Sequence, residues 1–83
     1  MSGDEISPEQ SRAARRLLNW SMVRLGGRSN VSESTIRNFE EGLRVLPANY
    51  IAAIRAALEA AGVEFTNGDQ PGVRMRKGRS KEN

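Results

Sequence analysis

The spacing of apolar residues changes at Gly62, and this change limits what the chain can fold into. Between Ile51 and Leu58 the large apolar residues lie three or four positions apart, which is the period of one face of a helix. After Gly62, Val63 and Phe65 alternate with polar residues, which is the period of a strand. The pattern therefore predicts a mainly α fold that ends in β structure.

The alternation of apolar and polar residues recurs in a second short segment, residues 73–76. The chain between the two segments contains Asn67-Gly68 and Pro71-Gly72, and both pairs favour turns. We therefore expect a C-terminal β-hairpin over residues 63–76. Beyond it, we expect residues 77–83 to form a disordered basic tail.

Four helices are expected before the hairpin, in a domain of residues 7–62 that follows a flexible lead-in of residues 1–6. Each of Ser7, Ser21 and Ser32 precedes a helical segment and can cap it by accepting a backbone N–H. Gln10 stands where it completes a capping box with Ser7. The expected helices begin at Pro8, at Met22, at Glu33 and near residues 47–49, and Gly42 and Gly62 are expected to stop the last two.

One apolar side of each helix is expected to face a common core. In chain order, these residues are Ala13, Ala14, Leu17 and Leu18, then Leu25 and Gly26, then Ile36 and Phe39, then Ile51, Ile54, Leu58 and Ala61. Trp20 is expected to close the core where the first helix ends. Gly26 permits close approach of another backbone segment, and Asn30 suits a left-handed turn because asparagine tolerates positive φ.

The composition excludes several classes of function. The 83 residues include no cysteine and no histidine, which removes disulfides, zinc fingers and mechanisms that need a thiol or an imidazole. We therefore expect one domain that is not an enzyme and needs no cofactor or metal. A membrane span is not expected either, and the lack of cysteine fits a reducing cytoplasm.

The positive charge of the chain is concentrated at its C-terminal end. The net charge is +3, but residues 1–72 hold eight Arg against nine Asp and Glu, a net charge of −1, while residues 73–83 carry +4. The isoelectric point of about 10.2 is therefore poor evidence for nucleic-acid binding by the folded part. The basic tail fits either a DNA-contacting arm or a solubilising end.

The segment from Trp20 to Gly42 has the organisation of a helix-turn-helix, over about residues 21–41. Two short helices flank a turn at residues 30–32, and the second helix can enter a major groove of DNA. The motifs Trp20-Ser21, Leu25-Gly26, residues 31–36 (Val-Ser-Glu-Ser-Thr-Ile) and residues 39–42 (Phe-Glu-Glu-Gly) resemble those of the Cro/repressor-type (XRE) regulators of bacteria and phages. The resemblance covers roughly residues 6–58, and it implies a compact four-helix Cro/repressor-like domain.

The resemblance also implies roles for individual residues. The exposed face of the recognition helix corresponds to Glu33, Ser34, Arg37 and Asn38, side chains that can read base edges. Ser21 corresponds to the cap of a helix whose N-terminal amides meet a phosphate, and Arg44 lies in a loop that contacts the DNA backbone or minor groove. Arg24 and Arg28 fit either phosphate contacts or a solvated surface. Arg15 and Glu40 correspond to a structural ion pair between the first and third helices.

Some residues depart from the family pattern and favour a different function. The family usually has a DNA-contacting glutamine at the position of Met22 and a polar residue at that of Val23. Leu43 and Leu46 are also apolar, so the four residues together predict a protein-binding patch. The chain is therefore either a sequence-specific regulator that binds double-stranded DNA or a degenerate helix-turn-helix module that binds a protein. One example of such a module is an antiactivator that masks another transcription regulator.

The assembly follows from the DNA-binding alternative. Helix-turn-helix proteins commonly bind two half-sites one helical turn apart, so we expect a homodimer. The strand around residues 73–76 would leave an edge with which a second copy could pair.

Overall fold

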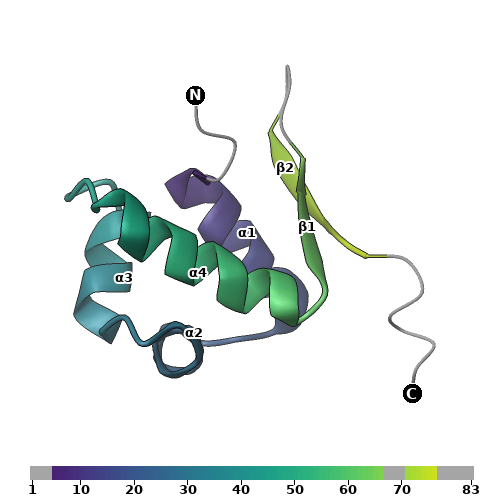
Figure 1. Cartoon of the computed structure of the whole chain (residues 1–83), viewed down its shortest axis with the longest axis horizontal. Coiled ribbons are helices and arrows are strands. Elements are labelled where there is room, and N and C mark those ends of the chain that lie inside the picture. The colour runs from purple at the N-terminus through teal and green to yellow at the C-terminus, as the bar shows by residue number, and fades with distance from the viewer. Residues whose placement is uncertain (1–4, 67–70, 77–83) are drawn as a thin grey trace.

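The computed structural model describes residues 5–66 and 71–76, and Figure 1 shows how the elements are arranged. The elements in chain order are α1 (Pro8–Leu18), α2 (Met22–Ser29), α3 (Glu33–Glu40), α4 (Ala48–Ala60), β1 (Val63–Thr66) and β2 (Gly72–Met75). The predicted fold class is confirmed, because four helices are followed by an antiparallel two-stranded hairpin. Most of the predicted turn, residues 67–70, and the predicted tail, residues 77–83, lie outside the described residues.

The first three helices begin at the predicted serine caps. The hydroxyl oxygens of Ser7, Ser21 and Ser32 each accept a backbone N–H three residues further along, at 3.0 to 3.2 Å. Gln10 completes the predicted capping box, since its side-chain oxygen accepts the backbone N–H of Ser7 at 2.9 Å. The fourth helix begins after Pro47, whose ring restricts φ.

The helices end where residues take up left-handed backbone conformations. Asn30 ends α2 with φ 64°, as predicted, and Asn19 ends α1 with φ 60°. Gly42 and Gly62 follow α3 and α4 with φ 75° and 106°, values that glycine adopts without the penalty of a Cβ atom. The short connections keep consecutive helices close to one another.

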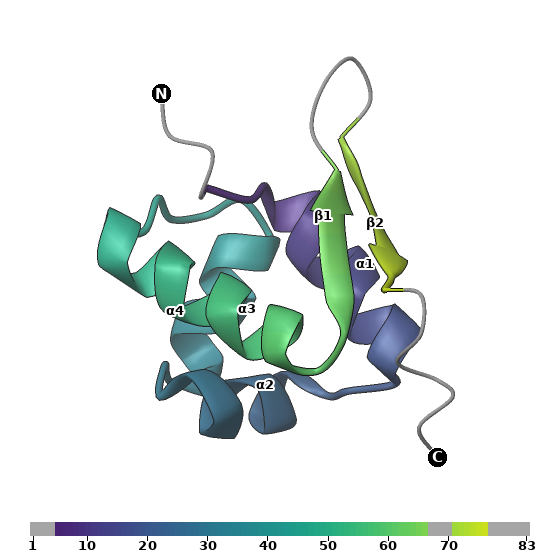
Figure 2. The ribbon, with the colours of Figure 1, turned by 45° about the vertical axis from the view of Figure 1, so that its right-hand side comes forward.

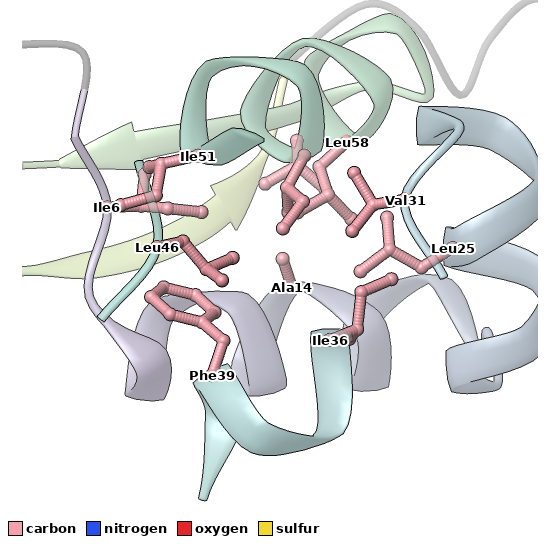
Figure 3. Packing of buried hydrophobic residues seen from close by; sticks show 11 residues of the cluster. Ile6, Ala14, Leu25, Val31, Ile36, Phe39, Leu46, Ile51 and Leu58 are labelled. Carbon is pink, nitrogen blue, oxygen red and sulfur yellow. The ribbon is translucent and has the colours of Figure 1, made fainter. Parts of the chain in front are cut away.

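The core lies between the four helices, with the hairpin along one side (Figure 1). Its members come from every helix, from the connecting loops and from β1: Ile6, Ala14, Leu25, Val31, Ile36, Phe39, Leu46, Ile51, Ile54, Leu58 and Val63. Figure 3 shows Ile36 and Phe39 pointing from α3 into this cluster, with Ala14 on the facing helix. The predicted apolar faces of α3 and α4 are thus confirmed, except that Ala61 is only partly buried.

The predicted apolar face of α1 is wrong in part. Leu17 is 46% exposed, whereas Ala14 is buried and Leu18 packs against the core. Two polar residues, Gln10 and Ser11, take inward positions instead. They can do so because the chain supplies hydrogen-bond partners for both, so burying them leaves no polar group unsatisfied.

One other prediction about the core needs correction. Ile6 is expected to lie in a flexible lead-in, but it is 5% exposed and belongs to the core (Figure 3). The core therefore begins before α1. Trp20, just after α1, is partly buried and packs against the core cluster, as expected.

The hairpin packs against α1 and α4 (Figure 2). Val63 pairs with Met75 and Phe65 with Val73, and Phe65 and Val73 lie against the core. The side-chain nitrogen of Gln10 donates to the backbone oxygens of Thr66 at 3.2 Å and Gly72 at 3.1 Å. One buried side chain therefore joins the first turn of α1 to both strands.

Candidate nucleic-acid interface

The α2–turn–α3 unit is packed tightly at Gly26. A Cβ atom added to this glycine would lie 2.7 Å from the backbone oxygen of Val31, in the turn between the helices. Such a separation is too short for non-bonded atoms, so the close approach expected from the sequence is confirmed. The two helices are thus held in one fixed arrangement at the turn.

The recognition helix expected from the sequence, α3, has one buried and one exposed side. Ile36, Phe39 and Glu40 are buried, whereas Glu33, Ser34 and Arg37 are exposed. The fourth predicted base-reading residue, Asn38, is half-buried. Three of the four predicted side chains are therefore accessible on the exposed side of one helix.

Two of these residues already contact each other. Nη2 of Arg37 donates to Oε2 of Glu33 at 2.6 Å, one helical turn away. Both side chains are still nearly half exposed, at 45% and 44%. The exposed side of α3 thus carries a paired guanidinium and carboxylate instead of an isolated positive charge.

A buried ion pair holds the opposite side of α3. The side chains of Arg15 and Glu40 pair between α1 and α3, as the resemblance implied. The hydroxyl of Ser11 donates to the same carboxylate at 2.7 Å. Hydrogen bonding to Glu40 raises the pKa of the Arg15 guanidinium, although burial acts in the opposite direction. This arginine therefore keeps its charge at any pH at which the fold is normally studied.

The first helix makes further contacts with the ends of the helix-turn-helix. Nη1 of Arg15 donates to the backbone oxygen of Trp20 at 3.1 Å, just before α2. Nη1 of Arg12 donates to the backbone oxygen of Glu40 at 2.8 Å, in the last residue of α3. Sequence reasoning missed the roles of Arg12 and Ser11, and no local signal marks them because both bonds join residues far apart in the chain.

The predicted phosphate-binding residues lie on α2 and on the loop after α3. Arg24 and Arg44 are exposed, and the hydroxyl of Ser21 caps α2. The guanidinium carbon of Arg28 lies 5.4 Å from the centre of the Trp20 ring, within range of a cation–π contact. The guanidinium group of Arg28 therefore lies over the Trp20 ring, close to the start of α2.

The predicted apolar patch does not form as one surface. Leu46 is 4% exposed and part of the core, and Met22 is half-buried against it. Val23 and Leu43 are exposed, but α2 and the loop after α3 stand well apart in Figure 1. The prediction was wrong for Leu46 because the loop turns this side chain inward beside Phe39 (Figure 3).

The structure reveals a different exposed apolar residue. Val45 is 91% exposed and lies two positions after Leu43, which is 71% exposed. Sequence reasoning missed Val45, although the apolar run of residues 43–47, interrupted by Arg44, was a possible signal. Among the described residues, the loop between α3 and α4 thus brings two strongly exposed apolar side chains close to the end of α3.

The described part of the chain has neither a metal-binding cluster nor a helix that could span a membrane. Over residues 5–66 and 71–76, no three acidic side chains gather in a way that could hold a metal ion. In the same residues, every helix is too short or too polar to cross a bilayer. Comparisons with models of protein families and with curated proteins found no match to this chain.

Proposed function

We propose that this protein binds double-stranded DNA in a sequence-specific manner and regulates transcription, with α3 in the major groove. The proposal rests on one observation: one side of α3 is buried against the domain and the opposite side is exposed. Its inner side is held by apolar packing and by the buried Glu40 carboxylate, while its outer side presents Glu33, Ser34 and Arg37 to solvent. A rigid helix with accessible polar side chains is what direct reading of base edges requires.

The exposed side chains offer complementary hydrogen-bonding groups. Arginine can donate two bonds to guanine, and asparagine can bond to adenine at two points. Arg37 and Asn38 would supply these contacts. Glutamate can accept from the amino group of cytosine, and serine can bond to several bases, which gives Glu33 and Ser34 supporting roles.

The phosphate contacts would come from a small number of residues. Ser21, Arg24, Arg28 and Arg44 are the candidates, and they flank α3 in the chain. Each neutralised phosphate adds about −0.9 to the slope of log binding constant against log salt concentration. We therefore expect a shallow salt dependence and weak binding to DNA of arbitrary sequence.

The test compares two arginine variants of the full chain. Arg37 and Arg74 are both exposed and each pairs with a glutamate, but Arg74 lies on the hairpin. The wild-type protein would first select duplexes from a randomised pool at physiological salt. Arg37→Ala should then weaken binding to the selected duplex by about 1–3 kcal/mol, and Arg74→Ala should have little effect. Equal losses in both variants, or no selected duplex, would contradict the proposal.

The assembly that suits this function is a homodimer, since two copies place two α3 helices on paired half-sites. In the described residues β2 pairs with β1 along one edge only, so a second copy has an edge to which it can add. Light scattering with and without the selected duplex measures the mass. A protein mass of 9.1 kDa at high concentration, both free and within the complex with DNA, would exclude the dimer.

A second candidate function is binding to another protein, for example as an antiactivator of a transcription regulator. The exposed loop residues Leu43 and Val45 favour it, because side chains of this kind commonly anchor protein contacts. Under this alternative no duplex is retained, and the chain captures another regulator in a pull-down. The double variant Leu43→Ser/Val45→Ser would abolish that capture, while Arg37→Ala would not.

A further inference from the structure

We propose that Glu33 is a specificity-determining residue that makes α3 select a cytosine–guanine base pair and reject other sequences. The inference rests on the proposed function and names the base pair that its site takes. It concerns a residue whose negative charge, taken alone, would oppose binding to a polyanion.

Glu33 lies at the beginning of α3. It is the first residue of the helix, directly after the cap Ser32. The N-terminus of a helix carries partial positive charge and exposed N–H groups, which attract phosphate. A carboxylate at this point neutralises that attraction. The start of α3 is therefore poorly suited to phosphate and better suited to a neutral base edge.

The contact with Arg37 gives this carboxylate a fixed partner. The 2.6 Å bond between Arg37 Nη2 and Glu33 Oε2 joins a group that only donates to a group that only accepts. The pair has no net charge, so it adds little to the attraction of DNA in general. Each group still has bonding positions left, because the bond uses one nitrogen and one oxygen.

A cytosine–guanine pair satisfies both remaining positions. In the major groove, cytosine presents an amino donor and guanine presents two acceptors, O6 and N7. Glu33 can accept from the first while Arg37 donates to the second. A guanine or thymine edge beside Glu33 presents only acceptors, so the carboxylate oxygen that Arg37 does not bind loses water without gaining a donor, which is unfavourable. An adenine–thymine pair also has an amino donor, but its thymine offers Arg37 one acceptor where guanine offers two. The discrimination thus comes from penalising the wrong sequence as well as from bonding the right one.

The test uses full-length protein and a matched pair of glutamate variants. Glu33→Gln removes the charge that faces the groove, and Glu41→Gln removes the same charge just beyond the other end of α3, where Glu41 is also exposed. Each variant would be titrated by fluorescence anisotropy with the duplex selected by the wild type and with duplexes altered at one base pair. Glutamine bonds well to adenine, so it also offers a different preference.

We expect Glu33→Gln to lower the ratio of affinities between cytosine–guanine and the other pairs at one position by about tenfold or more, while Glu41→Gln leaves the ratio unchanged. Glu33→Asp keeps a carboxylate and should keep the preference. Thermal unfolding followed by circular dichroism checks that all three variants fold.

The outcomes separate this inference from the proposed function. If the wild type selects a duplex but Glu33→Gln keeps the full ratio, the inference is wrong and the proposed function stands. The inference is also wrong if binding to the selected duplex depends on Arg37 but that duplex contains no cytosine–guanine pair. If the wild type selects no duplex, both fail together.

Discussion

The side chains of Arg15 and Glu40 meet at two points between α1 and α3. Nη2 of Arg15 lies 2.7 Å from Oε1 of Glu40, and Nε lies 2.9 Å from Oε2. The Glu40 side chain is inaccessible to solvent, and the Arg15 side chain is 14% exposed. Because a planar guanidinium and a carboxylate match at two points, the contact fixes the orientation of α3 as well as its distance from α1.

Breaking this pair should strongly destabilise the fold. We expect Arg15→Ala to lower the free energy of unfolding by about 3–5 kcal/mol, because it leaves the Glu40 carboxylate buried without its partner. Urea denaturation followed by circular dichroism measures the change. Arg74→Ala breaks an exposed pair with Glu64 and should cost less than about 1 kcal/mol. Similar losses in both variants would contradict the structural role of the buried pair.

The two adjacent glycines of α2 should respond in opposite ways to alanine. Gly26→Ala should destabilise the protein, since its Cβ atom would collide with the backbone oxygen of Val31. At Gly27 a Cβ atom meets nothing within 4 Å, so Gly27→Ala should stabilise the helix by about 1 kcal/mol. Thermal unfolding of the two variants side by side checks the difference. A destabilised Gly27→Ala or a neutral Gly26→Ala would show that α2 packs differently.

Gln10 should control the attachment of the hairpin. Gln10→Glu keeps the oxygen that accepts from Ser7 but replaces the donor to Thr66 and Gly72 with a second acceptor. We expect faster hydrogen exchange of the backbone amides in β1 and β2, with α1 still formed, because the carboxylate repels the strand carbonyls. Hydrogen exchange followed by NMR measures both regions in one experiment. Unchanged protection of the strands would mean that packing alone holds the hairpin.

The contact between Arg28 and Trp20 offers an internal fluorescent probe, since Trp20 is the single tryptophan in the chain. Arg28→Ala should change the tryptophan emission of the free protein, because the cation leaves the ring. It should also weaken binding to all duplexes alike and make the salt slope shallower by about 0.9. Arg24→Ala, on the same helix, removes an equal charge while leaving the ring contact in place. Identical emission from both variants would refute the contact.

Much of the fold could be predicted because its signals are local. The serine caps, the left-handed Asn30 and the change of period after Gly62 depend on neighbouring residues, and all are confirmed. The pairing of Glu33 with Arg37 is equally local, since helical spacing brings the two together. Each of these features involves residues only a few positions apart in the chain.

The remaining features depend on contacts between distant segments. Leu17 and Leu46 are both leucines, yet one is exposed and the other buried, because α1 turns its Ser11 side inward and the loop after α3 folds over Phe39. The inward position of Ser11 becomes favourable only when Glu40 is present to accept its hydrogen bond. The hydrophobic period of a helix is judged from its apolar residues alone. It therefore cannot identify a polar residue, such as Ser11, that is buried together with a hydrogen-bond partner.

The two ends of the Gln10 side chain place different demands on the residue at this position. Its oxygen serves the start of α1, a task that glutamate performs equally well in a capping box. Its nitrogen serves strand carbonyls that lie more than fifty residues later, a task that glutamate cannot perform. The start of α1 alone would therefore accept either residue, and it is the hairpin, at the far end of the domain, that requires the amide at the third position of this helix.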